Sequence, residues 1–242
     1  MRTNRLIFLL LGLALAAIAW AGMLRSSVSD EPLGLFTSLP ILWSEEGDVA
    51  AELGGGEPAH WARAVLARKG RVVALDMLDR ERLKRLDRLI LAQPRALAPE
   101  ENVALDEWVR GGGRLLLFAD PALTQESHLP ISDPRRPQAM AMLSPILGRW
   151  GLDLRFDDAQ PFGESDREVL SARVPVNLPG HFALKPGAHC ELLAENLAAR
   201  CAIGKGRVLA LADAALLEPA ETYLSREAAL TSLIDQALDK AP

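Results

Sequence analysis

Two short apolar runs joined by a helix constrain the fold of this 242-residue chain more than any other feature. The first run, RLILAQP, ends at Pro94, and the second, RLLLFAD, ends at Asp120. Between them, Pro99 lies in the first turn of a predicted helix that ends at the glycines 111–113. Such runs are typical of buried strands, and two strands linked by a helix form a parallel βαβ unit. The sequence therefore predicts an α/β domain with a mostly parallel sheet and helices on both of its faces.

The other segments extend this pattern. LGLFTSLP is predicted to be a strand that ends at Ser38, and RVVALD a strand that follows a helix. Farther along, GKGRVLALAD is typical of a core strand, and SREAALTSLIDQALDK predicts an amphipathic closing helix. The stretch Val169–Leu184 predicts β-structure, which is expected to be irregular because the stretch contains two prolines. We expect a single α/β domain over residues 33–242, with a β-hairpin region near 188–213.

The N-terminal segment predicts a membrane anchor. No charged residue occurs from Leu6 to Leu24, and Arg2 and Arg5 precede this run. As a helix the run would span about 28 Å, close to the thickness of the hydrocarbon core of a bilayer. Basic residues before such a run keep that end in the cytoplasm. We therefore expect residues 1–32 to be an uncleaved signal anchor and tether, in the cell inner membrane, with the body in the periplasm.

A cleaved signal peptide is the alternative, because two small-x-small sites at residues 17–19 and 19–21 resemble signal-peptidase sites. The body would then be secreted. In both cases it works outside the cytoplasm.

The two cysteines suit that compartment. Cys190 and Cys201 flank the sequence ELLAENLAAR, whose midpoint is Glu195-Asn196. A hairpin that turns at this midpoint places the cysteines opposite each other, within disulfide reach. A disulfide is expected in an oxidising periplasm. One alternative is a metal site that includes His189, although the spacing matches no zinc pattern; the other is two unpaired buried thiols.

The sequence contains none of the common catalytic or nucleotide-binding motifs. G-x-S-x-G, H-E-x-x-H, Walker and G-x-G-x-x-G patterns are all missing, so we expect no cofactor and no catalytic set. The four histidines are scattered, and His60 lies near a helix start, where capping or packing is the expected role. The net charge of -5, without a Lys/Arg stripe interleaved with aromatics, argues against nucleic acid as a partner.

Polar residues that follow the predicted strands form the candidate site. In open α/β sheets, ligands bind outside the carboxyl ends of the strands. If the ends of LFTS, LILAQP and LLLFADP lie side by side, four polar side chains line one rim and an aromatic ring can cover it. These are Ser38, Gln93, Arg95 and Asp120, with Trp43 as the ring. The set has donors and acceptors but no nucleophile with an adjacent base, which favours recognition over bond cleavage.

The alternative for these residues is ordinary strand-end capping. In that interpretation the carboxylate of Asp120 accepts hydrogen bonds from backbone amides of the next turn.

The order of four segments resembles the GldG-like family. The segments are LGLFTSLPILW, DRLILAQPRALAPEENVALDEWVRGGGRLLLFADP, LSPILGRWGLDL and GKGRVLALAD. The resemblance covers most of the chain from Leu33 to Asp213. It implies a flavodoxin-like sheet similar to class I glutamine amidotransferases, as in the related GIFT domains of an intraflagellar-transport subunit. It also implies a membrane-anchored accessory protein of an ABC-type transport system, whose permease or ATPase components would be its partners.

The same resemblance bears on catalysis. In an amidotransferase, the strand similar to RLLLFAD ends in a nucleophile elbow that carries cysteine, and a His-Glu pair follows later. Here the corner is Ala119-Asp120-Pro121, which carries no cysteine. We therefore expect a non-catalytic periplasmic module. A hydrolase or transferase that uses the strand-end cleft, and a structural envelope protein, are the alternatives.

Overall fold

The computed structural model describes residues 30–45, 60–220 and 222–239. The predicted signal anchor, Leu6–Leu24, lies outside these residues. Within the described part of the chain, no helix combines the length and the apolar character that crossing a membrane requires.

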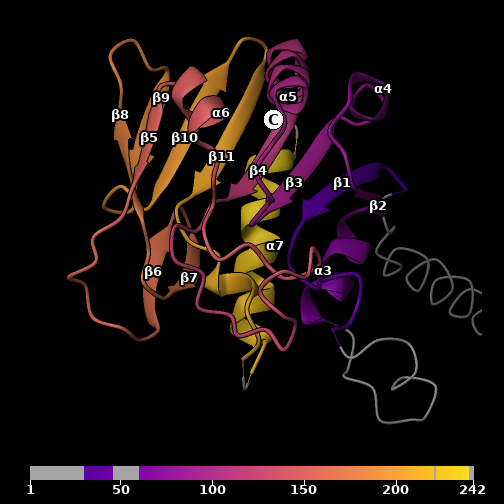
Figure 1. The fold of residues 1–242 in the computed structure, drawn as a ribbon. Coiled ribbons are helices and arrows are strands. Elements are labelled where there is room, and N and C mark those ends of the chain that lie inside the picture. The colour runs from indigo at the N-terminus through magenta and orange to yellow at the C-terminus, as the bar shows by residue number, and fades with distance from the viewer. Residues whose placement is uncertain (1–29, 46–59, 221, 240–242) are drawn as a thin grey trace, which may run out of the picture.

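A seven-stranded, mostly parallel sheet forms the centre of the fold (Figure 1). Five strands run parallel in the order β2-β1-β3-β4-β11, and two antiparallel strands, β10 and β9, extend the sheet beyond β11. The parallel strands are β1 (Pro32–Thr37), β2 (Arg71–Leu75), β3 (Arg88–Ala92), β4 (Arg114–Phe118) and β11 (Gly206–Leu211). The antiparallel strands are β9 (Cys190–Leu193) and β10 (Ala198–Ile203). The expected α/β class with a mostly parallel sheet is thus confirmed.

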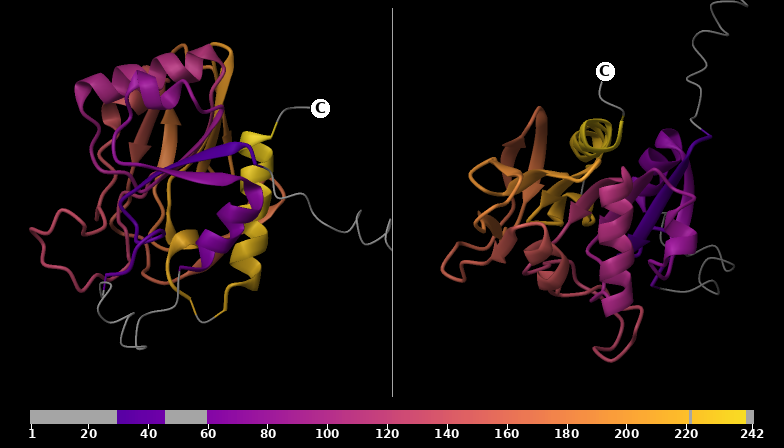
Figure 2. Two further views of the ribbon diagram at one scale, coloured as in Figure 1. Left: turned by 90° about the vertical axis from the view of Figure 1, so that its right-hand side faces the viewer. Right: turned by 90° about the horizontal axis from the view of Figure 1, so that it is seen from above.

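Helices cover both faces of this sheet, as the yellow α7 and the magenta α5 show in Figure 2. One face carries α3 (Trp61–Lys69) and α7 (Leu224–Leu238); the other carries α4 (Arg80–Leu83), α5 (Pro99–Gly111) and α6 (Ser144–Arg149). Strand residues alternate between the two layers. In β4, Leu116 and Phe118 pack with α3 and α7, whereas Leu115 and Leu117 pack with α5 and α6. Because side chains alternate across a strand, a strand buried on both faces must be apolar throughout.

The segment that most constrains the fold forms the expected βαβ unit, β3–α5–β4. The Glu101 carboxylate accepts a hydrogen bond of 2.9 Å from the backbone N–H of Ala98, which completes the N-terminal cap of α5. Gly112 caps the C-terminal end of this helix, and its φ of 127° favours glycine. A β-carbon on Gly113 would lie 2.5 Å from the Trp108 ring. These glycines therefore allow the sharp turn from helix to strand.

The β9–β10 hairpin contains a disulfide between Cys190 and Cys201. The register pairs the two cysteines directly, with Cα atoms 4.0 Å apart. The turn lies at residues 194–196, which all have positive φ values. The pairing expected from the symmetric spacing is therefore present, and neither a metal site with His189 nor a pair of free thiols is.

Two small antiparallel sheets flank the main sheet. One pairs β5 (Leu152–Arg155) with β8 (His181–Leu184), and the other pairs β6 (Ser165–Val169) with β7 (Ala172–Val176). The β6–β7 hairpin packs against α7, and β8 packs against β9. The prediction of β-structure over Val169–Leu184 is confirmed.

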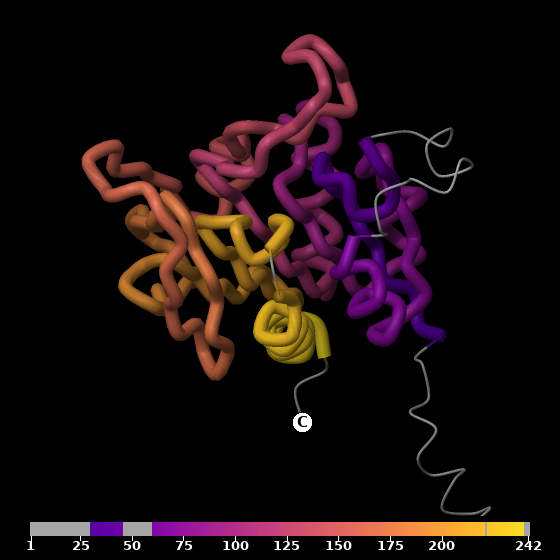
Figure 3. The backbone as a smooth tube through the Cα atoms, turned by 90° about the horizontal axis from the view of Figure 1, so that it is seen from below, coloured from indigo at the N-terminus to yellow at the C-terminus, as the bar shows by residue number. Residues whose placement is uncertain are grey.

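Loops that follow the parallel strands gather at the carboxyl edge of the sheet (Figure 3). One of them is the β4–α6 loop, residues 119–143, whose pink tip projects away from the body. The short helix η1 (Ala215–Leu217) follows β11 at the same edge. This edge is where the candidate site was expected.

Candidate functional site

Four polar side chains follow neighbouring strands at the carboxyl edge. Ser38 comes after β1, Gln93 after β3, Asp120 two residues after β4, and Asp213 two residues after β11. We call these four residues the strand-end cluster. The strand order places them in one row. In the sheet, β2 lies on one side of β1 and β3 lies on the other, so the strand order reverses direction at β1. Ligands of open α/β sheets bind at such topological switch points.

The Gln93 side chain joins two segments of the β4–α6 loop. Its Nε2 donates to the backbone carbonyl oxygens of Asp120 at 3.0 Å and Gln138 at 2.8 Å, and its Oε1 accepts from the backbone N–H of Asp120 at 2.9 Å. The side chain is fully buried, and the residue has a positive φ of 45°. Every polar atom of this amide therefore bonds to the loop backbone.

Ser38, at the end of β1, also forms a hydrogen bond with this loop. Its hydroxyl donates to the Gln93 carbonyl oxygen at 2.5 Å and accepts from the backbone N–H of Gln138 at 2.9 Å. Together Ser38 and Gln93 hold residue 138 against the ends of β1 and β3.

Asp120 is fully buried, and both of its carboxylate oxygens bond to backbone amides. Oδ1 accepts from the N–H of Ala122 at 2.7 Å, and Oδ2 accepts from the N–H of Ala214 at 3.0 Å. These are the bonds that the strand-end interpretation of Asp120 expects. Burial raises the pKa of Asp120 to about 6, against the opposing effect of the two amide bonds, and the charge of Glu218 adds to the rise.

Asp213 repeats the arrangement one strand away. Its Oδ1 accepts from the N–H of Ala215 at 2.6 Å, and its Oδ2 accepts from the N–H of Asn177 at 3.0 Å. Burial raises the pKa of Asp213 well above its usual range, and the charge of Asp120 raises it further. The sequence analysis missed Asp213. The available signal was the repeated ending of two core strands, FAD after β4 and LAD after β11.

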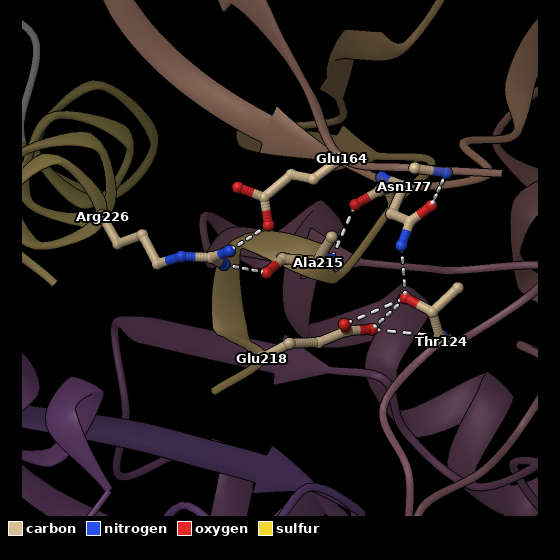
Figure 4. A network of polar contacts seen from close by, with 8 residues as sticks. Thr124, Glu164, Asn177, Ala215, Glu218 and Arg226 are labelled. Atoms are coloured by element: carbon tan, nitrogen blue, oxygen red, sulfur yellow. Dashed lines mark hydrogen bonds and ion pairs between the residues drawn. The ribbon is translucent and has the colours of Figure 1, made fainter. Parts of the chain in front are cut away.

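A polar network continues from the cluster toward α7 (Figure 4). The Glu218 carboxylate accepts from the backbone N–H of Thr124 at 3.1 Å, and the Thr124 Oγ1 lies 2.9 Å from both carboxylate oxygens. The Asn177 side chain donates to Thr124 Oγ1 at 3.2 Å. Burial raises the pKa of Glu218. The β4–α6 loop is thus tied to the segment that follows η1 and to the end of β7.

Arg226 of α7 joins the same region to the β6–β7 hairpin. Its guanidinium donates to the carbonyl oxygen of Ala215 and forms an ion pair with Glu164, as Figure 4 shows. The Arg226 side chain is almost fully buried, whereas that of Glu164 is 53% exposed. The ion pair therefore lies at the margin of the molecule, where the hairpin meets the helix.

Arg95, predicted to line the rim, has its polar contacts elsewhere. It forms two hydrogen bonds with the Glu101 carboxylate, at 2.7 and 2.8 Å, and its guanidinium lies 5.0 Å from the Phe36 ring centroid. The bonds from Arg95 lower the pKa of Glu101 to about 2, although its partial burial opposes the shift. Arg95 thus supports the start of α5 and not the strand-end cluster.

Trp43 is half-buried in the loop after β1. Within the described residues it has no hydrogen bond to the cluster. Of the five predicted rim residues, the structure thus joins Ser38, Gln93 and Asp120 by hydrogen bonds, and joins neither Arg95 nor Trp43 to them.

Among the hollows of the described surface are two that lie away from the cluster. A hollow of about 720 Å³ lies beside the edge strand β2, lined by Asp30, Leu42, Arg63, Ala67, Gly70, Arg71, Val72 and Ala74. A second, of about 500 Å³, lies between the β6–β7 hairpin and the start of α7, beside the Arg226–Glu164 pair. Neither is lined by a residue of the strand-end cluster. The side chains of the cluster are instead bonded to the backbone of the loops at the carboxyl edge.

The histidine at the start of α3 has the structural role that the sequence indicates. His60 Nδ1 accepts from the N–H of Ala62 at 3.2 Å, and Nε2 lies 2.9 Å from the carbonyl oxygen of Leu217. Its ring stacks on Trp61, and burial lowers its pKa. No group of three or more His, Cys, Asp or Glu side chains with metal-binding geometry occurs in the described part of the chain.

Comparisons with known proteins identify a family and a fold. Residues 55–218 match the family described as "Domain of unknown function (DUF4350)". No curated protein matches the chain. Among solved structures, the chain is similar to the exo-beta-1,4-mannosidase Op5Man5 from Opitutaceae bacterium strain TAV5, with a TM-score of 0.52 and 13% identity over 91% of this chain and 38% of the mannosidase. It is also similar to the mmIFT52 N-terminal domain, with a TM-score of 0.52 and 10% identity over 86% of this chain and 98% of that domain. This chain spans well under half of the mannosidase, and both likenesses show the fold alone.

Proposed function

We propose a function from the premise that this chain belongs to the DUF4350 family, a domain of unknown function. The chain is a membrane-anchored, non-catalytic binding module. Its segment Leu6–Leu24 holds it in the inner membrane with the body in the periplasm, and its carboxyl edge binds a component of an ABC-type transport system.

The bonding of the strand-end cluster carries this proposal. The Gln93 amide, the Ser38 hydroxyl and both oxygens of Asp120 all bond to backbone groups. A catalytic acid or base must come within hydrogen-bond reach of a substrate atom. Buried side chains that instead fix a loop to the sheet are suited to presenting that loop as a binding surface.

The loop that they fix exposes apolar side chains. Ile131 is 93% exposed, Met140 is 59% exposed and Met142 is 53% exposed. Exposed apolar side chains gathered on one segment are typical of protein interaction sites, and methionine adapts readily to a partner surface. This exposure supports a protein partner for the β4–α6 loop.

Two further observations support the fold assignment and the compartment. The parallel strands, numbered among themselves, lie in the order 2-1-3-4-5, which is the flavodoxin-like order and supports the amidotransferase-like fold that we propose. The Cys190–Cys201 disulfide supports a periplasmic body, because disulfides persist in oxidising compartments. The transport partner rests on the resemblance of segments such as LGLFTSLPILW to the GldG-like family.

Cross-linking in membranes of the native host, followed by purification of the full-length chain, tests the function. We expect mass spectrometry to identify an ABC permease or ATPase subunit in the product. The double variant Ile131→Ser/Met140→Ser should reduce its yield by about tenfold, as expected when interface side chains are truncated. The control Phe162→Ser/Leu224→Ser removes side chains that are 77% and 85% exposed outside this loop, and should leave the yield unchanged. A product without a transport subunit, or an equal loss in the control, contradicts the proposal.

One observation favours a second function, a hydrolase or transferase. The raised pKa values of Asp120 and Asp213 suit proton transfer, and perturbed carboxyls at the ends of strands are common in active sites. Their burial and their bonds to backbone amides oppose access of a substrate. Turnover of a chromogenic ester, amide or glycoside that Asp213→Asn abolishes, with the variant still folded, would favour this second function.

A further inference from the structure

The two edges of the sheet carry opposite charge. We call the edge where the parallel strands begin the amino edge. It contains nine Lys or Arg and four Asp or Glu, in the segments 30–32, 69–71, 84–88, 110–114, 203–207 and 237–239. The carboxyl edge contains three Lys or Arg and eight Asp or Glu, in the segments 37–45, 76–79, 93–98, 119–143, 212–220 and 222–223. Because the whole chain has a net charge of -5, the positive amino edge opposes the overall charge.

Some of these cations have a role within the fold. Arg114 and Arg207 donate to the last carbonyl groups of α7, at Leu238 and Ala237. Arg88 donates to the carbonyl oxygen of Lys69, the last residue of α3, at 3.1 Å. Cations at helix C-termini complement the unsatisfied carbonyl groups and the helix dipole. Helix capping therefore accounts for the arginines that are buried or half-buried at this edge.

Three exposed cations at the same edge have no such role. Arg71 begins β2, Arg85 precedes β3, and Lys205 lies in the turn before β11. None of the three forms an ion pair with a residue that the structure describes. Four strand spacings separate β2 from β11, so these cations extend over about 19 Å along the sheet. A row of this length matches an extended anionic surface better than a single small anion.

The tether leads to this edge. Pro32, the start of β1, comes only eight positions after Leu24, the end of the predicted anchor. Eight steps along the chain span at most about 28 Å when fully extended. Pro32 pairs with Arg71 in the sheet, so the tether joins the body at the positive edge. A chain anchored by Leu6–Leu24 therefore keeps its amino edge near the membrane surface.

We propose that the amino edge rests on the anionic phospholipid headgroups of the membrane that anchors the chain, through Arg71, Arg85 and Lys205. This inference rests on the membrane anchor of the proposed function. Each Lys or Arg close to an anionic surface favours the docked state by about fivefold. Docking at the amino edge directs the carboxyl edge, with its β4–α6 loop, away from the bilayer. The loop then faces the periplasmic space in which a partner binds.

Amide hydrogen exchange of the full-length chain in vesicles tests this docking. Vesicles of phosphatidylcholine are compared with vesicles that also contain phosphatidylglycerol. In the anionic vesicles we expect slower exchange, by about fivefold or more, in peptides that cover 69–71, 84–88 and 203–207. Salt near 0.5 M should abolish the difference, because it screens exposed charges.

A matched pair of triple variants separates lipid contact from net charge. In the triple variant Arg71→Ser/Arg85→Ser/Lys205→Ser, anionic vesicles should no longer slow amide exchange at the amino edge. The control variant Arg135→Ser/Arg155→Ser/Arg167→Ser removes the same charge from exposed positions outside the amino edge. Its amide exchange at the amino edge should still be slower in anionic vesicles. Unchanged exchange in β3 and β4 shows that each variant is folded.

Equal exchange in the two kinds of vesicle overturns the inference, as does slowing that survives in the Arg71/Arg85/Lys205 variant. A full-length chain that does not insert into vesicles overturns both the anchor and the docking. A chain that inserts and still cross-links to a transport subunit, but shows no lipid dependence, overturns the docking alone.

Discussion

Substitution of Asp120 by asparagine should change how the stability of the protein depends on pH. The Asp120 carboxyl is fully buried, and its pKa is raised to about 6 from a usual value of 3.8. The folded state therefore binds this proton more tightly than the unfolded state does. The resulting stabilisation is complete below pH 3.8 and is lost as the pH rises through about 6. A rise of about 2 pKa units corresponds to roughly 3 kcal/mol of unfolding free energy.

The Asp120→Asn variant has no titrating group at this position. Its amide nitrogen must face the N–H of either Ala122 or Ala214, which leaves one buried donor without an acceptor and costs about 1–3 kcal/mol. The variant should therefore be less stable than the wild type in acid. Between about pH 4 and pH 7 the unfolding free energy of the wild type should fall by roughly 3 kcal/mol relative to that of the variant, because only the wild type loses the proton. This change is at least as large as the deficit of the variant in acid, so near pH 7 the variant should equal or exceed the wild type in stability. Asp213 adds to the change, since only in the wild type does the charge of Asp120 raise the pKa of Asp213.

Urea unfolding of the full-length chain in detergent, repeated across this pH range, measures the difference. The effect of His60, whose pKa is lowered by burial, has the opposite sign but occurs in both proteins and cancels. A stability difference that stays constant from acid to neutral pH would refute the reasoning. It would mean that Asp120 ionises in the folded state as readily as in water.

Three further predictions concern the contacts that hold the fold and the site. Reduction of the disulfide, which joins cysteines 11 positions apart in the sequence, should lower the free energy of unfolding by about 3 kcal/mol. Identical urea midpoints for oxidised and reduced protein would contradict this. Gln93→Leu should lower it by about 2–4 kcal/mol and accelerate amide exchange in the β4–α6 loop, whereas the control Gln236→Leu on α7 should do neither. Equal amide exchange in the β4–α6 loop of these two variants would show that Gln93 does not hold this loop. Because the pKa of Glu101 is held at about 2, the contribution of this carboxylate to the free energy of unfolding is complete above pH 4.5 and is lost as the pH falls through about 2. Glu101→Gln should therefore make acid unfolding less steep, and an unchanged acid titration would show that the Arg95 contact does not stabilise the folded state.

Local patterns account for the parts of the fold that the sequence predicts. The unit β3–α5–β4 follows from apolar runs, a proline near the helix start and glycines at its end. The disulfide follows from the symmetric spacing of Cys190 and Cys201 about a turn. In each case the residues that decide the structure lie within a few tens of positions of one another.

The bonding at the carboxyl edge depends on contacts that no local pattern encodes. The Oδ2 of Asp120 bonds to Ala214, which is 94 residues away, and Ser38 bonds to residue 138, which is 100 residues away. Arg95 has the same polar character as its predicted neighbours, but it contacts Glu101, only six residues along the chain. Strand ends could thus be placed at one edge from the sequence, but which side chains bond to one another there could not.

Site-specific photo-cross-linking in living cells tests the central claim most directly. The probe is a photoreactive residue in place of Ile131, which is 93% exposed on the β4–α6 loop. We predict a cross-link between this position and a periplasmic segment of an ABC permease component. The same probe in place of Phe162, which is 77% exposed outside the loop, should give none. A permease cross-link from position 162 but not 131, or from neither position, would contradict the account.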